Sequence, residues 1–287
     1  MKSVSKAIIP AAGYGTRHLP ITKALPKELL PILDRPSVDY VVEECVSSGI
    51  TDICIVLSRG KGAVEDYFDR NPEIEANLAR SGKRELLKKV NPYLGKVNIT
   101  YIRQPEMKGT AYAIGMCREF TGGDAFAVLF PDDVVYNPED PATAQLIRAS
   151  VTTGSTIVGV KDLPPEEAVK YGVMVPAESK GRYVRIKGFV EKPDIKTLPS
   201  TITSVGRFVL TPDIYYYIDR VKPAANGERY LTDAIDAMAK DMNVYAYTFD
   251  GTRYDTGSTE GFLKANLDYA LREKELGAKI SEFLKTR

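Results

Sequence analysis

The side chains that could do chemistry in this sequence lie in short segments far apart along the chain. Arg17 and Lys27 lie in and after the segment PAAGYGTR, and Lys192 lies in the segment EKP. Asp132 lies in PDD, and Asp255 lies in RYD. Guanidinium and ammonium groups bind phosphate oxygens, and carboxylates can hold Mg²⁺ beside phosphates. Together these residues favour a site for a polyphosphate and a hard metal ion.

The segment PAAGYGTR follows directly on an apolar run, Lys6–Pro10. Its small residues allow the backbone to approach a ligand, and the N–H groups of such a turn form an anion cradle. A dinucleotide fingerprint would need glycine at His18, and the Lys-Ser/Thr pair of a Walker A loop does not follow at the right spacing. A plain strand-to-helix turn is the alternative. Arg17, Lys23 and Lys27 in one proline-containing loop favour a polyphosphate.

The other charged positions also have simpler alternatives. Asp132 follows the apolar run 125–130, and the carboxyl ends of parallel strands line the ligand crevice of doubly wound folds. A helix cap or an acidic turn is the alternative for Asp132. Lys192 shares a predicted strand face with apolar residues, which favours a partner such as a phosphate or a buried carboxylate, unless the strand ends earlier. Asp255 taken singly is compatible with an ordinary turn.

Composition excludes several classes of protein. The 287 residues include 39 Lys+Arg and 38 Asp+Glu, so no overall basic field favours nucleic acid or an anionic membrane as the main partner. Cys45, Cys54 and Cys117 form no C-x-x-C pattern, which disfavours a disulfide framework and a zinc site. We expect His18, the one histidine, to pack or cap within its loop. No apolar run reaches the roughly 18 residues of a membrane span and none resembles a signal peptide, so we expect a cytoplasmic protein.

Short apolar runs alternate with helical patterns in the first half of the chain. Between the first two runs, apolar residues recur at helical spacing from Val38 to Val46, and Gly49 occupies the position of a helix C-cap. Strands that alternate with helices predict a parallel sheet covered on both faces. We therefore expect an α/β fold with a Rossmann-like, doubly wound, mostly parallel mixed sheet. The expected strands are 6–10, 52–57, 99–103, 125–130 and 155–160.

Three further segments are expected to complete a single domain over residues 1–287. A helical insertion at about 72–96 contains one charged helix, Glu73–Lys89. Shorter strands follow from Tyr171 to Val209, where Val184, Ile186 and Val190 alternate with polar residues. The tail, about 261–287, reads as one amphipathic helix, Gly261–Phe283, that packs on its own domain or forms a subunit interface.

With these segments in order, the sequence resembles the bacterial-type UTP–glucose-1-phosphate uridylyltransferases (UDP-glucose pyrophosphorylases) of the sugar-nucleotidyltransferase superfamily. The resemblance runs from about Lys6 to about Ala270. G-x-G-T-R, P-K-E and E-K-P mark the superfamily, and VGRFVL, LTDAI and RYD mark this branch. The motifs that carry it are AAGYGTR (Ala11–Arg17), LPKELLPI (Leu25–Ile32), FPDD (Phe130–Asp133), YGV (Tyr171–Val173), VEKP (Val190–Pro193), VGRFVL (Val205–Leu210), LTDAI (Leu231–Ile235) and RYDTG (Arg253–Gly257).

The resemblance implies Mg²⁺-dependent reaction of UTP with glucose 1-phosphate to give UDP-glucose and pyrophosphate. It implies that Arg17 and Lys27 clamp the triphosphate, that Lys192 positions the sugar phosphate, and that Asp132 with Asp255 holds Mg²⁺. The implied nucleotide-binding residues are Ala11, Ala12, Gly13, Gly15, Glu28, Gln104, Gly109 and Thr110, of which Gln104, Gly109 and Thr110 receive the uracil. The implied sugar-binding residues are Gly172, Glu191 and Gly206.

The sequence departs from this family at three places. The family usually has phenylalanine at His18, Gly-Leu-Gly-His at Gly109–Tyr112, and often glutamine at Tyr230. Because Gly-Thr-Ala also occurs in relatives with other substrates, a thymidylyltransferase or another sugar-1-phosphate nucleotidyltransferase is the nearest alternative.

Two alternatives belong to other classes of protein. A non-catalytic regulator that binds a nucleotide sugar would be expected to lose the cations and carboxylates, which are present here. An NAD-dependent dehydrogenase is disfavoured by the missing third glycine. The tail helix and the habits of the family suggest a homodimer or homotetramer.

Overall fold

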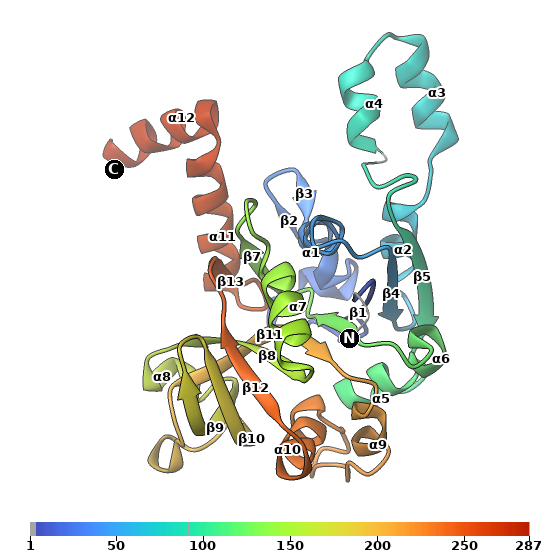
Figure 1. The fold of residues 1–287 in the computed structure, drawn as a ribbon. Coiled ribbons are helices and arrows are strands. Elements are labelled where there is room, and N and C mark those ends of the chain that lie inside the picture. The colour runs from blue at the N-terminus through green and yellow to red at the C-terminus, as the bar shows by residue number, and fades with distance from the viewer. Residues whose placement is uncertain (1–3, 91, 287) are drawn as a thin grey trace.

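The computed structural model describes residues 4–90 and 92–286, and a mixed sheet forms its centre (Figure 1). Within these residues the sheet has nine strands, in the order β5-β4-β1-β6-β11-β8-β12-β10-β9. Two short ribbons, β2–β3 and β7–β13, lie outside it. The predicted α/β class with a mixed, doubly wound sheet is confirmed. The sheet was expected to be mostly parallel, but the pairings of β9, β10 and β11 in it are antiparallel.

The parallel part of the sheet agrees closely with the predicted strands. It contains β1 (Lys6–Pro10), β4 (Asp52–Leu57), β5 (Asn98–Arg103) and β6 (Phe126–Leu129), and all pairings among them are parallel. Their carboxyl ends therefore meet at one edge of the sheet, which places the turn after Pro10 beside the residues that follow β5 and β6. Gly49 has a φ of 84° just beyond the first helix, as its predicted capping position requires.

The second part of the sheet is largely antiparallel. It contains β8 (Thr156–Asp162), β9 (Gly172–Lys180), β10 (Tyr183–Glu191), β11 (Ile202–Leu210) and β12 (Val244–Thr248), and only the pairing of β8 with β12 is parallel among these described strands. Thr203 of β11 pairs with both β8 and β9, whereas β6 pairs with β11 further along, at Arg207–Leu210. The start of β9 thus lies beyond the carboxyl end of β6, where it can close a cavity.

Two apolar clusters cover the faces of the sheet. One face packs against α1 (Ser37–Ser47) and α7 (Ala142–Thr153), and the other against α5 (Thr110–Gly115), α9 (Ile214–Ile218) and α10 (Leu231–Asp241). None of the helices in the described residues combines the length and apolar content that crossing a membrane requires. The remaining elements are η1 (Thr16–His18), η2 (Ile21–Lys23), η3 (Lys27–Leu29), β2 (Pro31–Ile32), β3 (Arg35–Pro36), α2 (Gly62–Phe68), α6 (Arg118–Thr121), β7 (Asp133–Tyr136), α8 (Pro165–Ala168), η4 (Ile195–Thr197) and β13 (Thr252–Asp255).

The prediction of which β10 side chains face the core is wrong at the carboxyl end of the strand. Val184 and Ile186 are buried as expected, but the pairing with β9 shifts register between Ile186 and Gly188. An extra residue in one strand reverses which side chains face the core. Phe189 is therefore buried and Val190 is exposed, so Lys192 does not share the apolar face of Ile186.

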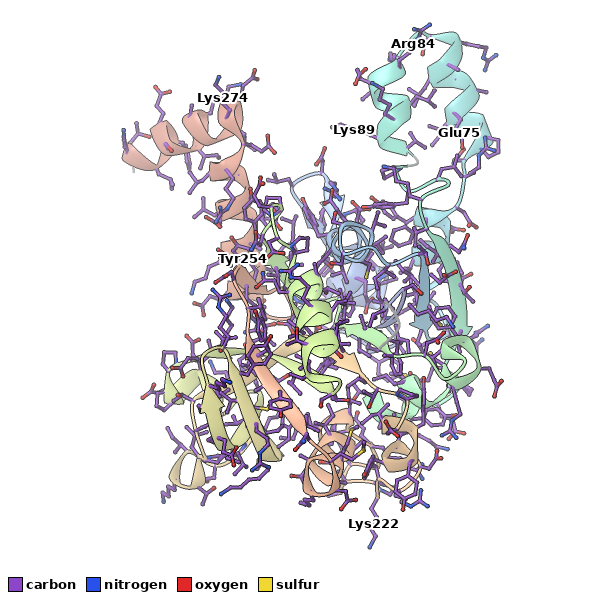
Figure 2. The ribbon with its side chains drawn as sticks, in the orientation of Figure 1. Glu75, Arg84, Lys89, Lys222, Tyr254 and Lys274 are labelled. Atoms are coloured by element: carbon purple, nitrogen blue, oxygen red, sulfur yellow. The ribbon has the colours of Figure 1, made fainter. Side chains whose placement is uncertain are left out.

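Both expected long helices are broken. The charged insertion forms α3 (Pro72–Arg80) and α4 (Arg84–Val90), because Gly82 adopts a φ of 68° between them. The tail forms α11 (Thr259–Arg272) and α12 (Lys274–Lys285), with extended backbone at Glu273. Figure 2 shows α3, α4 and α12 projecting from the body with charged side chains such as Arg84 and Lys274 on their surfaces.

Candidate functional site

Most of the predicted site residues line one cavity of about 720 Å³ beyond the carboxyl ends of β1, β5 and β6. We call Ala12, Gly13, Arg17 and Lys27 the β1 wall, and Gly172, Glu191, Lys192 and Thr232 the β10 wall. Asp132, Gly206 and Asp255 lie between the two walls. Of the predicted residues, those that line the cavity are Ala12, Gly13, Arg17, Lys27, Gln104, Gly109, Thr110, Asp132, Gly172, Glu191, Lys192, Gly206 and Asp255.

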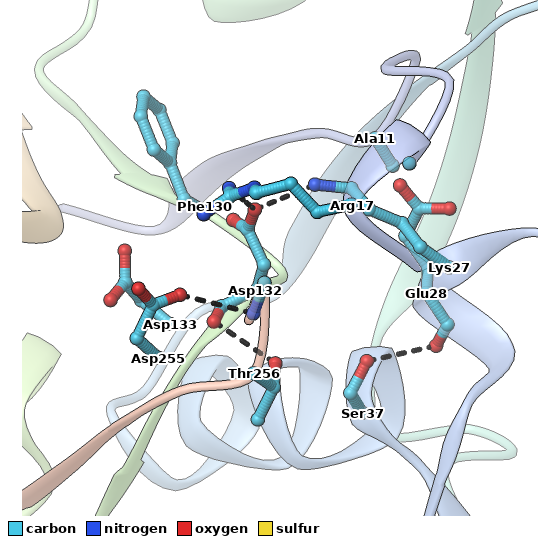
Figure 3. A network of polar contacts seen from close by, with 12 residues as sticks. Ala11, Arg17, Lys27, Glu28, Ser37, Phe130, Asp132, Asp133, Asp255 and Thr256 are labelled. Atoms are coloured by element: carbon cyan, nitrogen blue, oxygen red, sulfur yellow. Dashed lines mark hydrogen bonds and ion pairs between the residues drawn. The ribbon is translucent and has the colours of Figure 1, made fainter. Parts of the chain in front are cut away.

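An ion pair joins the β1 wall to the acidic turn after β6. The Lys27 Nζ donates to Asp132 Oδ2 at 2.6 Å, and the Arg17 Nη2 lies 3.7 Å from the same oxygen (Figure 3). Burial alone would raise the pKa of Asp132, but Lys27 and Arg17 hold that pKa down at about 2. Burial alone would lower the pKa of Lys27, and the carboxylates of Asp132 and Glu28 outweigh it, so the Lys27 pKa is raised. The Lys27 ammonium and the Asp132 carboxylate are therefore both charged at neutral pH.

The short glycine turn lets Lys27 reach this position. Gly15 has a φ of 69°, a region that side chains with a Cβ rarely adopt, and a Cβ there would lie 3.0 Å from the Lys27 Cβ. A Cβ on Gly13 would lie 4.0 Å from the Lys27 Cε. The Lys27 side chain thus lies against the turn.

Asp255 lies near Asp132 because β13 pairs with β7 and sets Asp255 opposite Asp133. Asp132 Oδ2 and Asp255 Oδ1 both lie 3.0 Å from the position that a Cβ on Gly257 would occupy, and the Arg17 Nη2 lies 2.8 Å from it. The Tyr171 hydroxyl donates to Asp255 Oδ2 at 2.6 Å and fixes that carboxylate. Two carboxylates this close together are ligands that suit a hard divalent cation, which takes few carboxylates together with water and phosphate oxygens. The Arg17 guanidinium lies beside both of them.

Two positions of the cavity wall have a positive φ, and the backbone is strained at the one that is not glycine. Gly206 has a φ of 66°, and a Cβ there would lie 2.5 Å from Asp133 Oδ2. Lys192 adopts a φ of 45° although it is not glycine, and its N–H donates to the Tyr171 carbonyl at 3.0 Å. Strained conformations of this kind cluster at functional sites, where surrounding contacts hold them.

The β10 wall carries charges that are less firmly paired. The Lys192 side chain is 64% exposed, and its Nζ lies 3.7 Å from Glu191 Oε1. Burial raises the pKa of Glu191, and Lys192 and Thr232 oppose the rise. A Cβ on Gly172 would lie 3.2 Å from Glu191 Oε2, so this glycine leaves room beside the carboxylate.

Three predicted nucleotide-binding residues lie behind the wall of the cavity. Ala11 is fully buried, Gly15 packs against Lys27, and the Glu28 carboxylate is buried. Sequence reasoning missed Lys61, a buried lysine whose Nζ donates to the Ala11 carbonyl at 2.5 Å and to Glu28 Oε1 and Oε2 at 2.8 and 2.7 Å. Burial raises the pKa of Glu28 and lowers that of Lys61, and each charge offsets part of the other's shift.

Arg207 was also missed, although it lies in the VGRFVL motif. This fully buried guanidinium binds the Glu44 carboxylate, with an Nη2–Oε2 distance of 2.8 Å. It also donates to the carbonyls of Phe130 at 3.2 Å and Asp133 at 2.6 Å, which flank the turn that carries Asp132. A charged residue inside an apolar strand pattern was the signal that could have identified it.

His18 reaches outside its own loop, contrary to expectation. Its Nε2 lies 2.9 Å from the Thr256 carbonyl oxygen, and its ring packs edge-on against Phe262. The Thr256 N–H in turn donates to the Asp132 carbonyl at 2.8 Å. His18 therefore joins the glycine turn to the loop that carries Asp255.

Comparison with known proteins shows which family has this fold and this cavity. The family model for nucleotidyl transferases matches residues 6–272, so the chain belongs to the nucleotidyl transferase family. Within that family, the chain is 47% identical over 285 residues to a UTP–glucose-1-phosphate uridylyltransferase of Staphylococcus haemolyticus, covering 99% of each chain. The predicted resemblance to the bacterial uridylyltransferases is confirmed.

Solved structures agree. A UDP-glucose pyrophosphorylase complexed with UDP-glucose matches with a TM-score of 0.86 and 37% identity, covering 94% of this chain and 100% of that one. A UTP-bound UGPase from Acinetobacter baumannii matches with a TM-score of 0.89 and 33% identity, covering 98% of both chains.

Proposed function

We propose that this enzyme transfers a uridylyl group from UTP to glucose 1-phosphate and releases pyrophosphate, giving UDP-glucose. The observation that carries the proposal is that Arg17, Lys27 and Asp132 form one charged group in the same cavity as Lys192 and Glu191. One side of the cavity suits a triphosphate, and the other suits a phosphorylated sugar. The relatives at 47% identity carry the same activity in their names.

In this reaction an oxygen of the sugar phosphate bonds to the α-phosphorus of UTP while the bond to pyrophosphate breaks. Arg17 and Lys27 bind the triphosphate and neutralise the charge that develops on the departing pyrophosphate. Lys192 holds the phosphate of the sugar, so that attacking oxygen and phosphorus are aligned. Since charge and alignment supply the rate, no side chain is assigned as a nucleophile.

The metal in this proposal is Mg²⁺. The carboxylates of Asp132 and Asp255 would hold it, because they face a common space and are hard oxygen ligands. When bound, Mg²⁺ supplies positive charge to phosphate oxygens. Tyr171 and the Gly257 N–H, which bind Asp255, keep that carboxylate oriented.

A substrate grid tests the function. Pyrophosphate release is measured for UTP, dTTP and ATP against glucose, galactose and N-acetylglucosamine 1-phosphates. We expect the largest kcat/KM for UTP with glucose 1-phosphate. A preference for dTTP of about tenfold or more would contradict the proposal and favour a thymidylyltransferase.

We also propose that residues 1–287 act as a single nucleotidyltransferase domain and that the chain forms a homo-oligomer. The continuous sheet that carries both cavity walls supports the first point. Exposed apolar side chains on α11 and α12, namely Leu263, Leu267, Leu271, Leu276 and Phe283, support the second. Sedimentation of the full chain separates monomer, dimer and tetramer. The cytoplasmic location stays a prediction.

A further inference from the structure

The turn that carries Asp132 is held at both of its ends by one buried side chain. The Arg207 Nη1 donates to the Phe130 carbonyl at 3.2 Å, and the Arg207 Nη2 donates to the Asp133 carbonyl at 2.6 Å. The Phe130 N–H also donates to the Gly206 carbonyl at 2.9 Å. The backbone on both sides of Asp132 is therefore fixed to β11, and the Asp132 side chain starts from a defined position.

The Arg207 guanidinium uses all of its donors in these contacts. Its Nε donates to the Glu44 carboxylate, with both oxygens at 3.1 Å, and its Nη2 donates to Glu44 Oε2 at 2.8 Å. Its Nη1 also donates to the Gly206 carbonyl at 3.2 Å. With the Phe130 and Asp133 carbonyls, these acceptors match the five N–H groups of a guanidinium. A lysine ammonium carries three donors on one atom, so it cannot bind the carboxylate and both ends of the turn in this geometry.

The Glu44 carboxylate fixes the guanidinium from the side opposite the turn. Glu44 lies on α1, and its Oε1 accepts from the Thr143 N–H of α7 at 3.0 Å and from the Thr143 hydroxyl at 2.6 Å. Both helices pack on the same face of the sheet. The position of the Asp132 turn therefore depends on two helices and a strand, which are more rigid than the turn itself.

Stability alone does not account for this buried ion pair. Arg207 and Glu44 are both buried, and removing two charges from water costs so much that well-packed apolar residues often stabilise such a site equally well. The neighbours Gly206 and Phe208 line the cavity, whereas the Arg207 side chain lies against α1. Arg207 therefore acts through backbone carbonyls and not on a substrate. Apolar residues could not supply the donors that these carbonyls receive.

We infer that Arg207 is a positioning residue that sets the place of the Asp132 carboxylate relative to Asp255 and Lys27. This inference rests on the proposed function. From the other side, the Thr256 N–H and Oγ1 donate to the Asp132 carbonyl at 2.8 and 2.9 Å. Because Thr256 follows Asp255 directly, both proposed metal ligands belong to one hydrogen-bonded frame. A displacement of about 1 Å in such a frame can lower the rate by about 10²-fold.

The variant Arg207→Lys tests the inference, because it keeps a positive charge beside Glu44 and removes donors from the turn. Mn²⁺ is the probe of the metal site, and its binding in the presence of UTP is measured by electron paramagnetic resonance. We expect Mn²⁺ binding to weaken and kcat to fall by about 10- to 100-fold, with an unchanged KM for glucose 1-phosphate. A change of less than about twofold in both quantities would overturn the inference, because losing a partner that orients a metal ligand costs more.

Two further variants separate positioning from stability. Thr143→Val removes one donor to Glu44 and leaves the contacts of Arg207 with the turn in place. Its Tm should fall, whereas its Mn²⁺ binding and kcat should equal those of the wild type. Arg207→Met/Glu44→Leu should be more stable than Arg207→Met, because no unpaired carboxylate stays buried, and it should keep the weakened Mn²⁺ binding.

Two results from these variants would show that the ion pair acts only through stability and would overturn the inference. One is wild-type Mn²⁺ binding by Arg207→Met/Glu44→Leu. The other is a loss of Mn²⁺ binding in Thr143→Val as large as that in Arg207→Lys.

Failure of the proposed function is seen separately, in the wild type. If the wild type prefers dTTP to UTP, the uridylyl assignment is contradicted, and the same loss of Mn²⁺ binding is expected for Arg207→Lys with dTTP. A wild type that binds no Mn²⁺ with either nucleotide would overturn the metal site, and this inference with it.

Discussion

The two walls of the cavity differ in how far their polar groups are satisfied before a substrate arrives. On the β1 wall, Lys27 pairs with Asp132 at 2.6 Å, and behind it the Lys61 ammonium is bound by Glu28 and Ala11. On the β10 wall, the Lys192 side chain is mostly exposed, and its Nζ lies 3.7 Å from Glu191 Oε1.

This difference has a physical cause. A triphosphate carries several negative charges, so the groups that receive it must be held in place against their own repulsion before it binds. Arg17, Lys27 and Lys61 are kept together by Asp132 and Glu28. The sugar is neutral apart from its phosphate, and its hydroxyls can complete an unfinished set of hydrogen bonds. We therefore expect substitutions on the β1 wall to lower activity or stability more than substitutions on the β10 wall.

The largest effect is expected for Asp132→Asn. Without this carboxylate, Lys27 and Arg17 lose their common partner and the proposed metal loses a ligand. We expect kcat/KM to fall by about 10²–10³-fold, measured by pyrophosphate release at saturating Mg²⁺. Asp219→Asn, which removes the exposed partner of Arg118, is the control and should leave activity unchanged. Activity of Asp132→Asn within threefold of the wild type would contradict the assignment.

Lys61→Met should mainly lower stability. It leaves the Glu28 carboxylate buried without its partner, which costs about 3 kcal/mol in the free energy of unfolding. Urea denaturation measures the loss, and the KM for UTP should rise because Ala11 is no longer held. The double variant Lys61→Met/Glu28→Gln should recover part of the stability. Lys264→Met, which breaks an exposed pair with Glu260, should leave Tm unchanged. Equal Tm values for Lys61→Met and Lys264→Met would show that the buried Lys61–Glu28 pair does not stabilise the fold.

Lys192→Ala should reduce activity without affecting stability. Its side chain is exposed, so the fold does not depend on it, but the sugar phosphate would lose a charge-assisted contact. We expect at least about a tenfold loss in kcat/KM, seen chiefly with glucose 1-phosphate. Lys187→Ala, at an exposed position of β10, the strand that ends just before Lys192, is the matched control. Unchanged turnover of Lys192→Ala would remove Lys192 from the proposed site.

The smallest difference is expected between two glycine variants. Gly206→Ala and Gly181→Ala both introduce a side chain at positive φ, 66° and 59° respectively. Only at Gly206 does the new Cβ meet other atoms, whereas the space around Gly181 is open. Gly181→Ala should cost about 1 kcal/mol, and Gly206→Ala about 1 kcal/mol more. Thermal unfolding measures both, and equal losses would show that crowding at Asp133 is relieved by small shifts.

Sequence patterns predicted the strands of the parallel half because each is a short, nearly continuous apolar run that needs no knowledge of its neighbours. They failed at β10 because its bulge depends on the pairing with β9, which the sequence of β10 alone does not record. The break in the charged helix had a local signal that the prediction overlooked, because glycine, here Gly82, is the usual residue just beyond a helix C-cap.

At the site, too, some features could be predicted from local sequence and others depend on tertiary contacts. The order and types of the charged residues, from Arg17 to Asp255, favoured a phosphate site and carried the resemblance to the uridylyltransferases, because only a few side chains can bind phosphates. The tertiary structure decided which residues face the cavity. It placed the Glu28 carboxylate behind the wall, where it binds Lys61, and it placed Arg207 against the carbonyl of Asp133, beside the turn that carries Asp132. The reason is that burial and hydrogen-bond partners are set by segments distant in sequence, and no local pattern records them.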